Sequence, residues 1–126
     1  MIPPKDFELL RAFDSGGRIT LSVYLRLDTP ESRESAYEEF MRQVRIRIEE
    51  CGSNVECRSE IQEDMEIVGL YLRTNGHRRH AGLAIFSCAP ELFWRAYPLA
   101  VPVPSQVTVG PQFNLEPLTQ SAATLS

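Results

Sequence analysis

Residues 18–27 have the sequence Arg-Ile-Thr-Leu-Ser-Val-Tyr-Leu-Arg-Leu. Its apolar and polar side chains alternate, which is typical of a β-strand with one buried face. The predicted buried face carries Ile19, Leu21, Val23, Leu25 and Leu27, and the opposite face carries Arg18, Thr20, Ser22, Tyr24 and Arg26. Such a face is buried only when other elements cover it, so the neighbouring segments are expected to supply the cover.

Helical patterns surround this strand. Apolar residues at helical spacing predict a first helix over residues 4–14, which two glycines then end. Thr29 as the N-cap and Pro30 at the first position predict the start of a second helix over 30–50. A narrow apolar seam predicts a third helix over 55–74. Because the loop between the two long helices is short, they are predicted to form an antiparallel αα-hairpin.

The second half of the chain is predicted to be mostly extended. Residues 81–88 are apolar and small, as in a strand buried on both faces, and 92–99 and 106–109 follow as further strands. Residues 116–118 indicate the start of a final helix. The order α-β-α-α-β-β-β predicts an α+β fold, in which a mixed four-stranded sheet packs with an N-terminal helix and a long αα-hairpin.

Composition excludes several classes of protein. The chain has 126 residues, enough for one domain, and a net charge of −4, which disfavours a protein that wraps duplex DNA. Residues 28–66 hold 12 acids and 5 arginines, a net charge of −7, so the predicted hairpin is acidic. No apolar run is long enough to span a membrane. The start of the chain lacks a signal-peptide pattern and the cysteine count is odd, which favours the cytoplasm.

The candidate binding residues lie at the two ends of the hairpin. Arg73, His77, Arg78 and Arg79 form a basic connector that can hold phosphates of rRNA or tRNA, or that can be a solvated turn at a helix C-terminus. At the other end, Ser53, Asn54 and Arg58 lie in the predicted hairpin tip. No nucleophile elbow, phosphate-binding glycine loop or catalytic triad occurs, so neither a catalytic residue nor a cofactor is expected.

The cysteines and the acidic run are each open to a second interpretation. Cys51 and Cys57 flank the tip and can form a disulfide, although a reducing cytoplasm favours free thiols. Cys88 is predicted to be a buried small hydrophobe. The cysteine and histidine spacings do not match a zinc pattern, so no metal is expected. The acidic run of the third predicted helix has two interpretations, of which a solvated helix face is the stronger and a Mg²⁺ site the weaker. Its residues are Glu56, Glu60, Glu63, Asp64 and Glu66.

Several strings resemble the N-terminal domain of the archaeo-eukaryotic class I peptide chain release factors, and more closely the release-factor-like proteins of bacteria. They are the strand Leu21-Ser22-Val23-Tyr24-Leu25 followed by Pro30, the helical hairpin over 30–74, the pair Asn75-Gly76 followed by Gly82-Leu83-Ala84-Ile85-Phe86, and the exit Phe113-Asn114-Leu115-Glu116-Pro117-Leu118. By this resemblance, residues 1–118 form one release-factor-like domain. Residues 119–126 would then be a linker toward an absent domain, which in the family carries a Gly-Gly-Gln loop for peptidyl-tRNA hydrolysis.

The chain departs from the motifs that the family uses to read stop codons. Residues 51–58 replace its Asn-Ile-Lys-Ser tip, residues 17–19 keep only the glycine of its Gly-Thr-Ser element, and only Phe113 remains of its Tyr-x-Cys-x-x-x-Phe element. Codon reading needs groups that hydrogen-bond and stack on bases. The sequence therefore predicts a non-catalytic binding domain for ribosome association or rescue, without stop-codon decoding. The alternatives are a protein-interaction domain that uses the acidic hairpin, and a hydrolase with a deep pocket.

Overall fold

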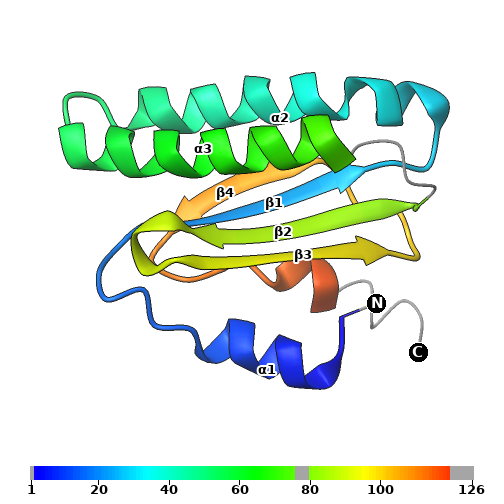
Figure 1. The fold of residues 1–126 in the computed structure, drawn as a ribbon, viewed down its shortest axis with the longest axis horizontal. Coiled ribbons are helices and arrows are strands. Elements are labelled where there is room, and N and C mark those ends of the chain that lie inside the picture. Colours follow the sequence, from blue (N-terminus) through cyan, green and yellow to red (C-terminus); the bar gives the residue numbers. More distant parts are fainter. Residues whose placement is uncertain (1, 76–79, 120–126) are drawn as a thin grey trace.

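The computed structural model describes residues 2–75 and 80–119, and it shows one β-sheet between two covering layers (Figure 1). The predicted fold class and element order are confirmed. The elements are α1 (Pro4–Ala12), β1 (Thr20–Arg26), α2 (Pro30–Glu50), α3 (Val55–Asn75), β2 (Gly82–Cys88), the 3-10 helix η1 (Ala89–Glu91), β3 (Phe93–Leu99) and β4 (Gln106–Gly110). Residues 116–119 are also helical, as the sequence indicates.

The sheet has the strand order β3-β2-β1-β4 and is antiparallel throughout, whereas the sequence prediction was a mixed sheet. The hairpin explains the difference. Since α2 runs back along the sheet and α3 returns, the chain re-enters the sheet at the end where β1 stops. β2 therefore runs opposite to β1, and the tight turn at η1 makes β3 antiparallel to β2.

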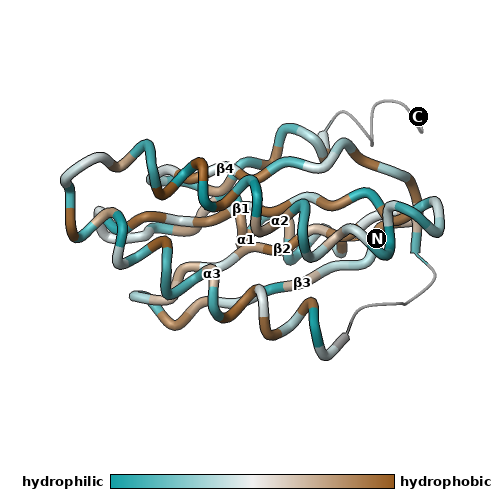
Figure 2. Tube along the Cα trace, turned by 90° about the horizontal axis from the view of Figure 1, so that it is seen from above, coloured by the Kyte–Doolittle hydropathy of each residue, from teal (hydrophilic) through white to brown (hydrophobic). Residues whose placement is uncertain are grey.

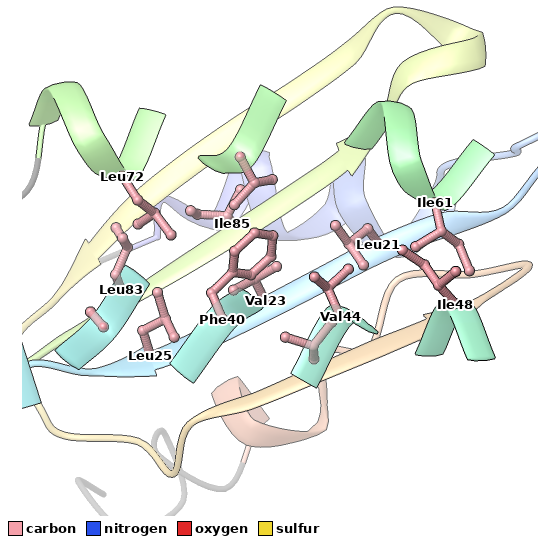
Figure 3. Close-up of a cluster of buried hydrophobic side chains, with 13 residues drawn as sticks. Leu21, Val23, Leu25, Phe40, Val44, Ile48, Ile61, Leu72, Leu83 and Ile85 are labelled. Carbon is pink, nitrogen blue, oxygen red and sulfur yellow. The ribbon is translucent and has the colours of Figure 1, made fainter. Parts of the chain in front are cut away.

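The α2–α3 hairpin covers one face of the sheet (Figure 1). Figure 2 shows the two helices lying side by side along the strands. Thr29 caps α2 as predicted, because its side chain accepts the Ser32 N–H and the Ser32 hydroxyl accepts the Thr29 N–H. Apolar residues of both helices and of the strands form the core in Figure 3: Leu21, Val23, Leu25, Phe40, Val44, Ile48, Ile61, Leu72, Leu83 and Ile85.

The opposite face of the sheet is also buried, which corrects the prediction that β1 has one buried face. Thr20, Ser22 and Tyr24 are all at most 1% exposed. The polar atoms on this face have partners: the Thr20 hydroxyl donates to the Gly110 carbonyl, the Tyr24 hydroxyl donates to the Asn114 carbonyl, and the Ser22 hydroxyl accepts the Asn114 N–H. Hydroxyl groups can enter a core when they are satisfied in this way.

Both edge strands of the sheet carry features that disfavour pairing with another strand. At β4, the side chain of Gln43 accepts the Val107 N–H and donates to the Ser105 carbonyl, each at 3.0 Å. At β3, the guanidinium of Arg95 donates to the Trp94 carbonyl at 2.7 Å, and Pro98 has no N–H to offer. These are devices that keep edge strands from pairing with other chains. Among residues 2–75 and 80–119, no helix is both long and apolar enough to cross a membrane.

Candidate functional site

The hairpin tip is closed by several independent contacts. A disulfide joins Cys51 at the end of α2 to Cys57 in the first turn of α3, so the sequence-based preference for free thiols is corrected. Gly52 supplies the left-handed backbone conformation, with φ of +61°, that the turn requires. Asn54 accepts the Cys57 N–H through its side chain at 3.0 Å and so caps α3. Arg58 donates to the Gly52 carbonyl at 3.2 Å.

These contacts define what the tip can offer a partner. Asn54 and Arg58 hold the turn in shape, so each has a structural role that the sequence analysis did not assign to it. Ser53 is exposed and makes no side-chain hydrogen bond within the described chain. Val55 is apolar and 76% exposed. The tip is therefore a small preshaped surface that combines one hydroxyl, one apolar side chain and a guanidinium.

The basic residues at the base of the hairpin do not join the tip. Arg73 lies fifteen positions after Arg58 in α3, a distance along the helix axis of roughly 22 Å. Arg73 is exposed, and its guanidinium carbon lies 5.8 Å from the centre of the Tyr37 ring, which fits a cation–π contact. His77, Arg78 and Arg79 lie outside the described residues, so the phosphate-binding prediction stays a prediction.

The acidic run on α3 is divided by the fold. Glu56, Glu63 and Glu66 are exposed, as expected of a solvated face. Glu60 forms an ion pair with Arg18 at 2.9 Å and also accepts the Ile19 N–H. Asp64 is the exception: it is fully buried, which corrects the prediction that it belongs to the solvated face. Within the described ranges, no group of three or more His, Cys, Asp or Glu residues could hold a metal ion.

Asp64 is buried because the strand below α3 supplies donors to it. The Ser87 hydroxyl and the Ala89 N–H both donate to its Oδ1, at 2.6 and 3.0 Å. Burial raises the pKa of Asp64 to about 6, against the opposite effect of these two donors. The sequence held a signal for this residue, because position 64 lies three residues after Ile61 and four before Val68, on the buried stripe of α3.

The outer surface of the hairpin is acidic. Several of its exposed glutamates form no ion pair within the described residues, and they include Glu31, Glu34, Glu38, Glu49, Glu56, Glu63 and Glu66. The arginines are partly neutralised, since Arg42 pairs with Glu39 at 2.6 Å and Arg47 with Glu50 at 3.3 Å. This surface would repel phosphates and attract basic groups.

A shallow open groove runs along the solvent side of α2. Its lining mixes apolar side chains with charges of both signs: Tyr37, Glu38, Met41, Arg42, Arg45, Ile46 and Glu49. A catalytic pocket would normally bring a few titratable groups together in an enclosed space. This groove is open to solvent, and the sequence analysis did not identify it.

The comparisons with known proteins give a fold and no family. No family model matches the chain, and no curated protein matches it. Among solved structures, one chain described as "Archaeal protein" has a TM-score of 0.58 and 10% sequence identity to this chain. The match covers 93% of this chain and 34% of that chain, so the present chain spans about a third of that protein's length. At this identity the likeness shows a shared fold alone.

Proposed function

We propose that this domain is a non-catalytic binding module that associates with the ribosome in the cytoplasm and does not read stop codons. The observation that carries the proposal is the α2–α3 hairpin, whose tip is held in shape by the Asn54 cap and by the Arg58–Gly52 hydrogen bond, neither of which depends on the oxidation state of the cysteines. A preshaped contact loses little conformational entropy on binding. The resemblance to release-factor-like proteins supplies the partner, because their equivalent hairpin faces the ribosomal A site.

The charge of the hairpin restricts how it would approach a ribosome. The exposed glutamates along α2 and α3 are unfavourable beside RNA phosphates, whereas Ser53 and Arg58 at the tip are compatible with them. We therefore assign the contact to the tip alone, with Arg73 and the connector 77–79 as a second candidate contact at the base. Residues 51–58 lack the Asn-Ile-Lys-Ser tip with which the family reads codons, which supports association without decoding.

Co-sedimentation with bacterial ribosomes tests this proposal. The full chain should pellet with ribosomes, and Ser53→Glu should reduce the pelleted fraction severalfold, because it places a negative charge where the tip would meet RNA. Ser35→Glu is the matched control, since it makes the same change on exposed surface at the other end of α2. Failure of the unmodified chain to pellet, or equal pelleting of the two variants, would sink the proposal.

The acidic surface favours a second candidate function, the binding of a basic protein. Its unpaired glutamates would attract lysine- or arginine-rich segments, in an association that salt weakens. Replacing Glu63 and Glu66 by lysine should then abolish binding, while Ser53→Glu should leave it unchanged. If Ser53→Glu reduces binding and the lysine variant does not, the result supports the ribosomal contact at the tip. The two variants therefore distinguish the two candidate functions.

A further inference from the structure

The buried carboxyl group of Asp64 connects α3 to the corner where β2 meets η1. Asp64 lies near the middle of α3, and its side chain is fully buried. Through Oδ1 it accepts hydrogen bonds from Ser87, near the end of β2, and from Ala89, the first residue of η1. Figure 1 shows the turn at η1 lying beneath the half of α3 that leads to the tip. One oxygen atom therefore connects the helix to both the strand and the turn.

The other oxygen of the same carboxyl group, Oδ2, is also buried. Within residues 2–75 and 80–119, no group forms a hydrogen bond with Asp64 Oδ2. No Lys, Arg or His in the described part of the chain forms an ion pair with Asp64. An anion in such a place is costly, since it has lost its water and gained no counter-ion. Adding a proton removes the charge and most of that cost.

The groups around Asp64 add to this preference for the neutral acid. On its own helix, Glu60 and Glu63 are negative and act in the same direction as burial. The nearby guanidinium of Arg18 is already engaged by Glu60. The titratable groups of the strand and the turn below are the buried thiol of Cys88, whose pKa is raised, and the carboxyl group of Glu91, so neither supplies a positive charge to Asp64.

We propose that Asp64 is a proton-controlled latch between α3 and the corner where β2 meets η1. In the protonated state it holds the helix on the corner through Ser87 and Ala89. In the ionised state the bare Oδ2 favours the entry of water, and the corner opens locally more often. Because the pKa in the folded protein is raised, from 3.8 to about 6, the stabilisation is complete below pH 4 and is lost as the pH rises through 6.

The Ala89 amide reports the latch directly, because its proton is donated to Asp64. Hydrogen exchange of the full chain, followed by NMR from pH 4 to 8 and corrected for intrinsic exchange, gives its opening constant. That constant should rise about a hundredfold across the titration and then level off. The Asn114 amide is the matched control, since it donates to the Ser22 hydroxyl, which does not titrate.

Three variants test the chemistry of the latch. Asp64→Asn should remove the pH dependence of the Ala89 opening constant. Ser87→Ala should move its midpoint to higher pH, because it removes a donor that favours the anion, and Glu63→Gln should move it to lower pH. If Asp64→Asn fails to fold, the pKa of Asp64 is measured instead in the unmodified chain, from the pH dependence of its carboxyl ¹³C chemical shift. A midpoint at or below pH 4, or an unchanged pH dependence in Asp64→Asn, would overturn the proposal.

Discussion

Above the sheet lie two helices of 21 residues each, α2 and α3, whereas below it lie the nine-residue α1 and an irregular segment that includes residues 111–115 (Figure 1). The upper core is mainly aliphatic and is supplied at helical spacing by Phe40, Val44, Ile61 and Val68, among others. The lower core is rich in aromatic rings, among them Tyr24, Phe86, Tyr97 and Phe113.

The upper cover (α2 and α3) and the lower cover (α1 and the irregular segment) satisfy the hydrogen-bonding groups of their backbones in different ways. A helix pairs its own N–H and C=O groups, so α2 and α3 need only apolar contacts to the sheet. Irregular chain must find other partners for these groups, and below the sheet the hydroxyls of Ser15, Thr20, Ser22 and Tyr24 provide them. A face of a sheet that carries hydroxyl groups can therefore be buried when a segment without regular secondary structure packs on it.

Truncating one ring on each face should give the largest effects. Phe86→Ala should lower the free energy of unfolding by about 5 kcal/mol, and Phe40→Ala by about 3–4 kcal/mol. Both rings are fully buried, but Phe86 also makes edge-to-face contacts with Tyr24 and Phe113 and a tilted contact with Tyr97. Urea denaturation of both variants measures the difference. A larger loss for Phe40→Ala would mean that the aromatic contacts add nothing to burial.

Opening the disulfide should weaken the upper cover by a smaller amount. The chain-entropy model gives about 2 kcal/mol for a loop of this size, and the Asn54 cap should keep the tip folded in the variant Cys51→Ser/Cys57→Ser. A reductant should lower the melting temperature of the unmodified chain and leave that of the double variant unchanged. The disulfide would be contradicted if a reductant left the melting temperature of the unmodified chain unchanged and if Cys51 and Cys57 could both be alkylated without reduction.

Removing one buried hydroxyl tests the lower cover. Tyr24→Phe should cost about 1–2 kcal/mol, because it leaves the Asn114 carbonyl without its donor in a part-buried site. Tyr37→Phe is the control, since that hydroxyl makes no hydrogen bond within the described residues, and its cost should stay within about 0.5 kcal/mol. Chemical denaturation of both variants gives the two values, and equal costs would show that the lower hydroxyl contributes nothing specific.

The same difference between the covers explains what could be predicted from the sequence. The stripe from Phe40 to Ile48 and the seam from Ile61 to Leu72 follow helical periodicity, so the hairpin and its buried face were predicted correctly. The burial of Ser22 and Thr20 could not be predicted, since it depends on partners about 90 residues away. The charge of Asp64 predicts a solvated position, whereas its place between Ile61 and Val68 on the stripe predicts burial, and the structure shows burial. The disulfide could not be settled, because spacing alone does not fix the oxidation state of Cys51 and Cys57.

The smallest expected effect concerns the attachment of α1. This helix has no side-chain cap and buries only Leu10 among its residues, so a helix of nine residues depends on its contacts with the sheet. One of these contacts is the Tyr97 hydroxyl, which donates to Asp6 at 2.8 Å, and burial raises the pKa of Tyr97 to about 12.

Tyr97→Phe should therefore cost about 0.5–1 kcal/mol of global stability, since the ring stays in place and one partly buried hydrogen bond is lost. Its larger consequence should be local: limited proteolysis should cut within residues 1–18 faster than in the unmodified chain, while the α2–α3 hairpin keeps its protection. Arg11→Ala on the same helix is the control, because its ion pair with Glu8 is exposed and contributes little. If both variants are cleaved at the unmodified rate, α1 is held by apolar packing alone, and hydroxyl contacts matter only for the irregular part of the lower cover.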